Sequence, residues 1–112
     1  MIEKILLDYL SSQLTDVPVY MERPKDQPDM YIVLEKTGSS KTNHIKTATF
    51  AVQSYAPTMY EAAALNEIVK GVVENAITLD AISKVTLNSD YNFTDTAEKR
   101  YRYQAVFDFV HF

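Results

Sequence analysis

The segment that most constrains the fold is the closing stretch of the chain, RYRYQAVFDFVHF (100–112), in which two kinds of side chain alternate. A period of two places successive residues on opposite faces of a β-strand. The largely apolar face would hold Tyr101, Tyr103, Ala105, Phe107, Phe109 and His111. The opposite face would hold Arg102, Gln104, Val106, Asp108, Val110 and Phe112. A strand of this kind predicts a sheet whose apolar face is covered by another layer.

Two amphipathic segments predict the helices of that layer. Residues 2–14 carry apolar side chains at helical spacing, and this helix should end before Pro18, which disfavours helical backbone at the residue before it. PTMYE (57–61) has the pattern of a capping box, in which Thr58 accepts from the N–H of Glu61 and the Glu61 carboxylate returns to the N–H of Thr58. The apolar face of this second helix is expected to hold Leu65, Ile68, Val69, Val72 and Ala76, with Gly71 marking close packing on a strand.

The remaining patterns predict strands at 17–22, 30–36, 47–55 and 82–93, besides the closing one. Between them, TGSSKTNHIK (37–46) is predicted as a long flexible hairpin loop and TDTAEK (94–99) as a turn. Within 82–93 the alternation puts Val85, Leu87, Tyr91 and Phe93 on one side. The predicted fold is a single α+β domain over residues 1–112, with two helices on one face of a mostly antiparallel sheet of about five strands. Its order is α-β-β-β-α-β-β.

Composition excludes several classes of chemistry. The chain has 112 residues, no cysteine and two glycines, so disulfides, thiolate zinc sites, phosphate-cradling loops and dinucleotide fingerprints are not expected. His44 and His111 lie on different elements and are interpreted as a loop residue and a strand end. We therefore expect no catalytic, cofactor-binding or metal site, and no enzyme. A signal peptide and a membrane span are not expected either, which favours action in the cytosol of the producing cell.

The second face of the sheet allows two interpretations. Its mixture of polar and apolar side chains, together with eight tyrosines, is typical of a subunit contact. An ordinary solvated sheet face would give the same pattern. Arg100 and Arg102 alternate with tyrosines, as in proteins that bind single-stranded nucleic acid. A net charge of −4 favours a salt-bridged surface or a subunit contact instead.

The layout resembles that of the tail terminator proteins (tail completion, or tail-to-head joining) of long-tailed bacteriophages. The similar features are an amphipathic helix at 2–14, a short strand with a proline-rich loop at 17–29, and the strand YIVLE (31–35). A polar hairpin loop, a second helix opened by PTMYEAAAL (57–65), and the closing strand RYRYQAVFDFV (100–110) complete the resemblance.

The resemblance implies a ring, typically of six subunits, that caps the tail tube, stops its polymerisation and joins it to the head connector. It further implies self-association, contacts with the tube and connector proteins, DNA passing through without specific binding, and no membrane. The protein would belong to the virion and be assembled in the bacterial host cytoplasm. On this interpretation the loop at 37–46 reaches a neighbouring protein or the ring channel. The candidate interface residues are Lys41, His44, Lys46, Tyr31, Arg100 and Arg102.

Two alternatives stay open from the sequence. One is another head–tail junction component, such as a head-closure or minor tail protein. The other is a host-encoded α+β module that binds a peptide or small ligand on its sheet.

Overall fold

The computed structural model describes residues 1–95, 97 and 100–112. Along the chain the elements are α1 (Ile2–Gln13), β1 (Val19–Tyr20), β2 (Tyr31–Thr42), β3 (Ile45–Ala56), α2 (Met59–Glu74), the 3₁₀ helix η1 (Asn75–Thr78), β4 (Ile82–Asn92) and β5 (Tyr101–His111). The predicted α+β class and the order α-β-β-β-α-β-β are confirmed. The turn predicted at 94–99 includes residues 96 and 98–99, which lie outside the described residues.

The five strands form one mixed sheet in the order β1-β2-β3-β5-β4. Only β1 runs parallel to its neighbour, and every other pair of adjacent strands is antiparallel. The brevity of β1 follows from its sequence, because Pro18 has no N–H to offer a ladder. The carbonyl oxygen of Pro18 still accepts from the N–H of Ile32 at 3.0 Å, and this bond places β1 at the sheet edge.

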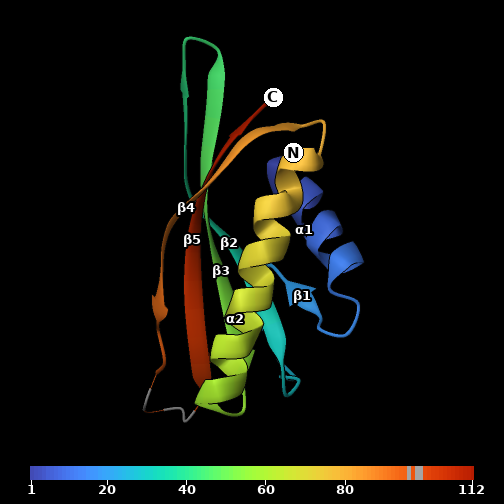
Figure 1. Ribbon diagram of the computed structural model, residues 1–112, viewed down its shortest axis with the longest axis vertical. Helices are drawn as coiled ribbons and strands as arrows, with labels where there is room; N and C mark the ends of the chain where they lie inside the picture. Colours follow the sequence, from blue (N-terminus) through green and yellow to red (C-terminus); the bar gives the residue numbers. More distant parts are fainter. Residues whose placement is uncertain (96, 98–99) are drawn as a thin grey trace.

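Both helices cover the same face of the sheet (Figure 1). The main core between the layers joins Leu6 and Leu10 of α1 with Val69 of α2 and with Phe50 and Phe107 of the sheet, all at most 2% exposed. Burying a side chain of this size contributes about 1.5–3 kcal/mol, so this layer supplies much of the stability. The hydroxyl of Tyr9 donates to the carbonyl of Val72 at 2.7 Å, which ties the helices together, and burial raises the pKa of this phenol.

Helix α2 begins at the predicted cap, with one change in its bonding. The Thr58 hydroxyl accepts from the N–H of Glu61 at 3.1 Å, as predicted, but it also donates to the Glu61 carboxylate at 3.1 Å. The carboxylate therefore meets the hydroxyl of Thr58 and not its N–H. The buried face of α2 holds Ala62, Leu65, Asn66, Val69 and Val73.

Two predictions for α2 are wrong. Ile68 was expected in the core but is 57% exposed, because a helical step of 100° per residue places it to one side of the buried line from Leu65 to Val69. Gly71 does not mark close packing on a strand, since an added Cβ would meet no atom within 4 Å. The exposed side of α2 is thus more open than the sequence pattern indicated.

The prediction of a flexible loop at 37–46 is wrong, because these residues continue strands β2 and β3 into a long hairpin. The turn has only two residues, Asn43 and His44, whose φ angles of 52° and 67° are the left-handed backbone conformation that a type I′ turn requires. Strand pairing then extends to Thr42 and Ile45, with one register shift between Lys36 and Gly38. The outer part of this hairpin extends beyond the ends of both helices (Figure 1), along the longest dimension of a molecule measuring 45 × 25 × 24 Å.

The predicted alternation along β4 is wrong in its second half. A bulge between Leu87 and Ser89 adds one residue against β5, and an added residue reverses which face the following side chains occupy. Asp90 therefore pairs with Ala105 and points toward α2, whereas Tyr91 pairs with Gln104 on the second face of the sheet. The bulge brings a carboxylate to the helix layer and moves an aromatic ring away from it.

Candidate assembly surface

The hairpin arm, defined as residues 36–47 of β2 and β3, concentrates positive charge. It contains three of the eleven basic residues and none of the fifteen acidic ones, so the rest of the chain has a formal charge of −7. Every side chain of the arm is exposed except Thr47, which is half-buried. Ile45, beside the turn, is 55% exposed. The arm therefore offers a cationic surface with an apolar tip.

Two lysines of the arm and a histidine of β5 form a row across neighbouring strands. Lys41 of β2 is the cross-strand partner of Lys46 in β3, and Lys46 is the partner of His111 in β5. Directly opposed residues in antiparallel strands project to the same face, so these three groups lie next to one another. We call this set the cationic row.

A hollow of about 340 Å³ lies at the cationic row, against the start of α1. Its lining combines basic, hydroxyl and apolar side chains: Ile2, Lys36, Ser39, Ser40, Lys41, Lys46, Thr47 and His111. The lysines and the histidine ring can donate to an oxygen ligand, and the hydroxyls can both donate and accept. The arrangement suits an oxygen-bearing anion with a small apolar neighbour.

Lys36 differs from the other lysines of the hollow because it already has an acidic partner. Its ammonium lies 3.0 Å from the carboxylate of Glu3 in the first turn of α1, and this hydrogen bond lowers the pKa of Glu3. Within the described part of the chain, the side chains of Lys41 and Lys46 form no hydrogen bond and no ion pair. The two unpaired ammonium groups remain available to a ligand.

At the other end of the hairpin a tyrosine–arginine cluster covers the second face of the sheet. Tyr31 and Tyr55 stack with ring centroids 4.4 Å apart, and the guanidinium groups of Arg23, Arg100 and Arg102 lie 5.5–5.6 Å from these rings. The two tyrosines are 0% and 2% exposed. The chain's own arginines thus shelter this aromatic area, which sequence alone left open to a neighbouring subunit.

The two candidate arginines bind neutral oxygens. Arg102 donates to the hydroxyl of Tyr55 and to the carbonyl of Phe93, both at 2.8 Å. Arg100 donates to the carbonyls of Pro28 and Asp29, which fastens the proline-rich loop to the sheet. Both guanidinium groups have a structural role within the subunit.

A chain of amide and hydroxyl groups crosses the middle of the second face. Gln53 donates to Gln104 at 2.8 Å, and Gln104 donates to the hydroxyl of Tyr91 at 2.6 Å. Beyond this chain Tyr91 and Phe93 are 41% and 43% exposed, with rings 5.8 Å apart in an edge-to-face contact. The apolar surface left open on this face is therefore concentrated along β4.

The six candidate interface residues fall into two separate groups. Lys41 and Lys46 are brought together in the cationic row, and His44 lies in the turn beyond them. Tyr31, Arg100 and Arg102 lie in the tyrosine–arginine cluster, where Tyr31 is fully buried. Sequence reasoning missed His111 and Ile45 as members of the arm surface. Extending the strand alternation through 37–46 would have indicated Ile45, whereas the place of His111 follows only from the pairing of β3 with β5.

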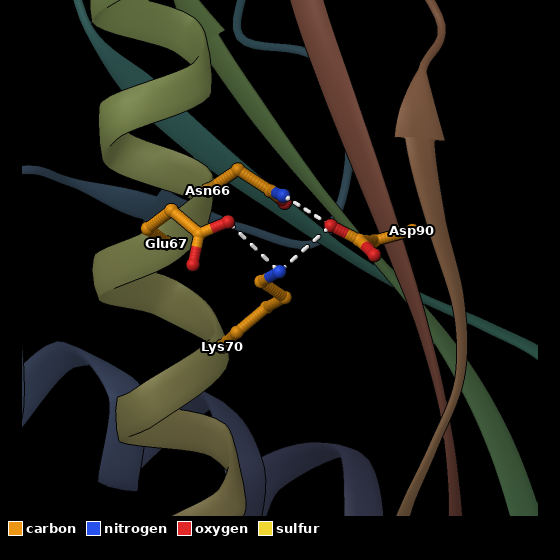
Figure 2. A network of polar contacts seen from close by, with 4 residues as sticks. All are labelled: Asn66, Glu67, Lys70 and Asp90. Carbon is orange, nitrogen blue, oxygen red and sulfur yellow. Dashed lines mark hydrogen bonds and ion pairs between the residues drawn. The ribbon is translucent and has the colours of Figure 1, made fainter.

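A polar network fixes α2 against β4 (Figure 2). The carboxylate of Asp90 accepts from Asn66 at 3.0 Å and from Lys70 at 2.9 Å, and Lys70 lies 2.9 Å from Glu67. The hydrogen bond with Lys70 lowers the pKa of Asp90, and the bonds with Asp90 and Glu67 raise the pKa of Lys70. These contacts position the helix, and within the network the buried Oδ1 of Asn66 has no hydrogen-bond partner.

The described residues include neither a metal-ligand cluster nor a membrane-spanning helix. Among them, no group of three histidine, cysteine, aspartate or glutamate side chains lies close enough to hold a metal ion. No helix in the described ranges is long and apolar enough to cross a membrane.

Comparison with known proteins leaves the chain without a family. No protein-family model matches it, and no curated protein matches its sequence. A function has to be proposed from the surfaces described above and from the resemblance in layout.

Proposed function

We propose that this chain is a structural subunit of a bacteriophage virion, the tail terminator. As a ring of six copies it caps the tail tube and joins it to the head connector. Its assembly takes place in the bacterial host cytoplasm. Its function lies in contacts between proteins, and the proposal assigns it no catalytic residue and no cofactor.

The hairpin arm is the observation that carries this proposal. It extends beyond the helices, exposes Ile45, and holds three basic and no acidic residues in a chain whose remainder has a charge of −7. Charge segregated in this way favours a contact in which the arm of one copy meets the acidic body of the next. Such head-to-tail contacts use two different patches, and they close into a ring when the rotation between copies allows it.

The acidic body also suits a ring that DNA passes without specific binding. DNA binding is driven by neutralising several phosphates, and a net charge of −4 opposes this at long range. A cationic arm directed at a neighbouring protein is consistent with that balance.

The test is the oligomeric state of the purified chain, alone and with the tail tube protein of the same genome. Native mass spectrometry and light scattering should detect a ring of six copies, or a monomer that joins rings when tube protein is added. Electron microscopy should then show tubes of limited length. A chain that stays monomeric in the presence of tube protein, and leaves tube growth unchanged, contradicts the proposal.

A shortened arm gives the matched variant. Replacing residues 40–47 by an Asn-Gly turn would join Ser39 directly to its cross-strand partner Ala48 and preserve the remaining register. We expect the fold to persist, by circular dichroism, and ring formation to weaken. Substituting Lys25 and Lys84, which are exposed elsewhere, by glutamine serves as the control. Equal loss of assembly in the control would show that total charge matters and the arm does not.

The hollow beside the arm favours a second candidate function, a module that binds a peptide or small ligand. Its volume of about 340 Å³ lies within the range of small-molecule sites. This candidate predicts a stable monomer that binds one ligand tightly whether or not tube protein is present. Another head–tail junction role, as a head-closure or minor tail protein, predicts binding to the connector without an effect on tube length.

A further inference from the structure

The cationic row has an unfavourable arrangement in the isolated subunit. Lys41 and Lys46 face each other directly across two strands, and like charges in this position repel. His111 continues the row on the third strand. Within the described residues no carboxylate pairs with either lysine. A bound anion would remove the repulsion and satisfy both ammonium groups.

The hollow at this row has the donors that an oxyanion requires. Two unpaired ammonium groups and Ser39 line it, and hydrogen bonds from charged donors to an oxyanion are about twice as strong as neutral ones. Nδ1 of His111 lies 3.1 Å from the main-chain oxygen of Phe112, so Nε2 can donate to an oxyanion only when both ring nitrogens carry a proton. Ile2 adds an apolar wall.

The surroundings decide which oxyanion fits. A nucleic acid gains affinity from several neutralised phosphates, whereas this site has two unpaired lysines in a protein of net charge −4. A single free phosphate would make no use of the apolar wall that Ile2 provides. A protein segment that carries a few carboxylates and an aliphatic side chain matches both the charge and the lining.

We infer that the hollow lined by Lys41, Lys46 and His111 beside the hairpin arm is a binding site for the carboxylates of an acidic protein segment. This site deepens the proposed function. Only the source of the acidic segment rests on that function, because in a ring a neighbouring subunit would supply the segment. Binding itself is a property of the single chain and is measured without assembly.

The test uses fluorescence anisotropy with a short labelled peptide of glutamate and leucine. The wild-type chain should bind it, and binding should weaken as salt rises, because exposed charge pairs are screened. The variant Lys41→Gln/Lys46→Gln should bind about tenfold more weakly for each lysine removed, since a hydrogen bond to a charged group contributes about that factor. The variant Lys25→Gln/Lys84→Gln has the same net charge and should bind like the wild type.

Three competitors separate the ligand classes. The matching peptide of glutamine and leucine, inorganic phosphate and an oligothymidylate should each compete poorly. No binding of the acidic peptide, equal binding by the Lys41/Lys46 variant and its control, or tighter binding of any competitor would overturn the inference. These results do not depend on ring formation, so peptide binding without rings refutes only the terminator function, and rings without peptide binding refute only this site.

Discussion

The substitution Asp90→Asn tests the most specific contact between the layers. It keeps the size of the side chain but removes the negative charge of the carboxylate, to which Asn66 and Lys70 donate hydrogen bonds at 3.0 and 2.9 Å. The side chains of Asp90 and Lys70 are 28% and 17% exposed, so water screens their interaction only in part. The amide can still accept from one neighbour, and Lys70 keeps its contact with Glu67.

The expected loss of stability follows from this geometry. A hydrogen bond to a charged group contributes about 1.5–3 kcal/mol, and partial exposure reduces this to about 1–2 kcal/mol here. For a domain of this size each kcal/mol shifts the midpoint of thermal unfolding by about 4 °C. Asp90→Asn should therefore lower Tm by about 4–8 °C near neutral pH. Asp80→Asn, at an exposed position, is the control and should leave Tm unchanged.

The pH dependence gives the sharper test. Because the folded-state pKa of Asp90 is lowered, its contribution is complete above the unfolded value near 3.9 and is lost as pH falls through the folded value. The pKa of Lys70 is raised, so its contribution is present below about 10.4 and is lost only as pH rises beyond that. Urea unfolding should show a constant gap between wild type and variant from pH 6 to about pH 9, closing in acid. A gap that persists at about pH 2, or no gap at pH 7, would refute the reasoning.

Three further substitutions test the arm and α2. Lys41→Glu should pair with Lys46 and slow amide hydrogen exchange in the arm at low salt, by about twofold to fivefold, whereas unchanged exchange would contradict the register. His44→Gly relieves a φ of 67° and should slow the same exchange by a similar factor, because a left-handed backbone costs about 1–2 kcal/mol without glycine. Gly71→Ala should raise the free energy of unfolding in urea by about 1 kcal/mol, because the new methyl meets no atom within 4 Å; a decrease would indicate hidden crowding.

The helices, and the order of helices and strands along the chain, were predictable because their apolar residues recur with a clear period. The alternation of 100–112 indicated a strand with one buried face, and Phe107 and Phe109 are indeed 0% and 1% exposed. The N-cap at Thr58 was equally predictable, because its hydrogen bond joins residues only three positions apart in the sequence. Features that depend on neighbours along the chain were within reach of the sequence.

The arm was missed because its strands are polar on both faces, so no apolar period marks them. Its turn uses Asn43 and His44 at positive φ, without the glycine that usually signals a two-residue hairpin. The bulge after Leu87 was missed for a different reason: it exists only relative to β5. The candidate lysines were identified from the sequence, but their alignment with His111 required the register of three strands.

The bulges of β4 also bear on how copies of this protein can meet. β4 is the outermost strand, and register shifts near Ile82 and after Leu87 break the regular row of backbone groups that a foreign strand would need. Fibre-like growth by adding strand to strand is thereby hindered along this border. Copies are left to recognise one another through side chains, and recognition of that kind can stop at a fixed number of partners.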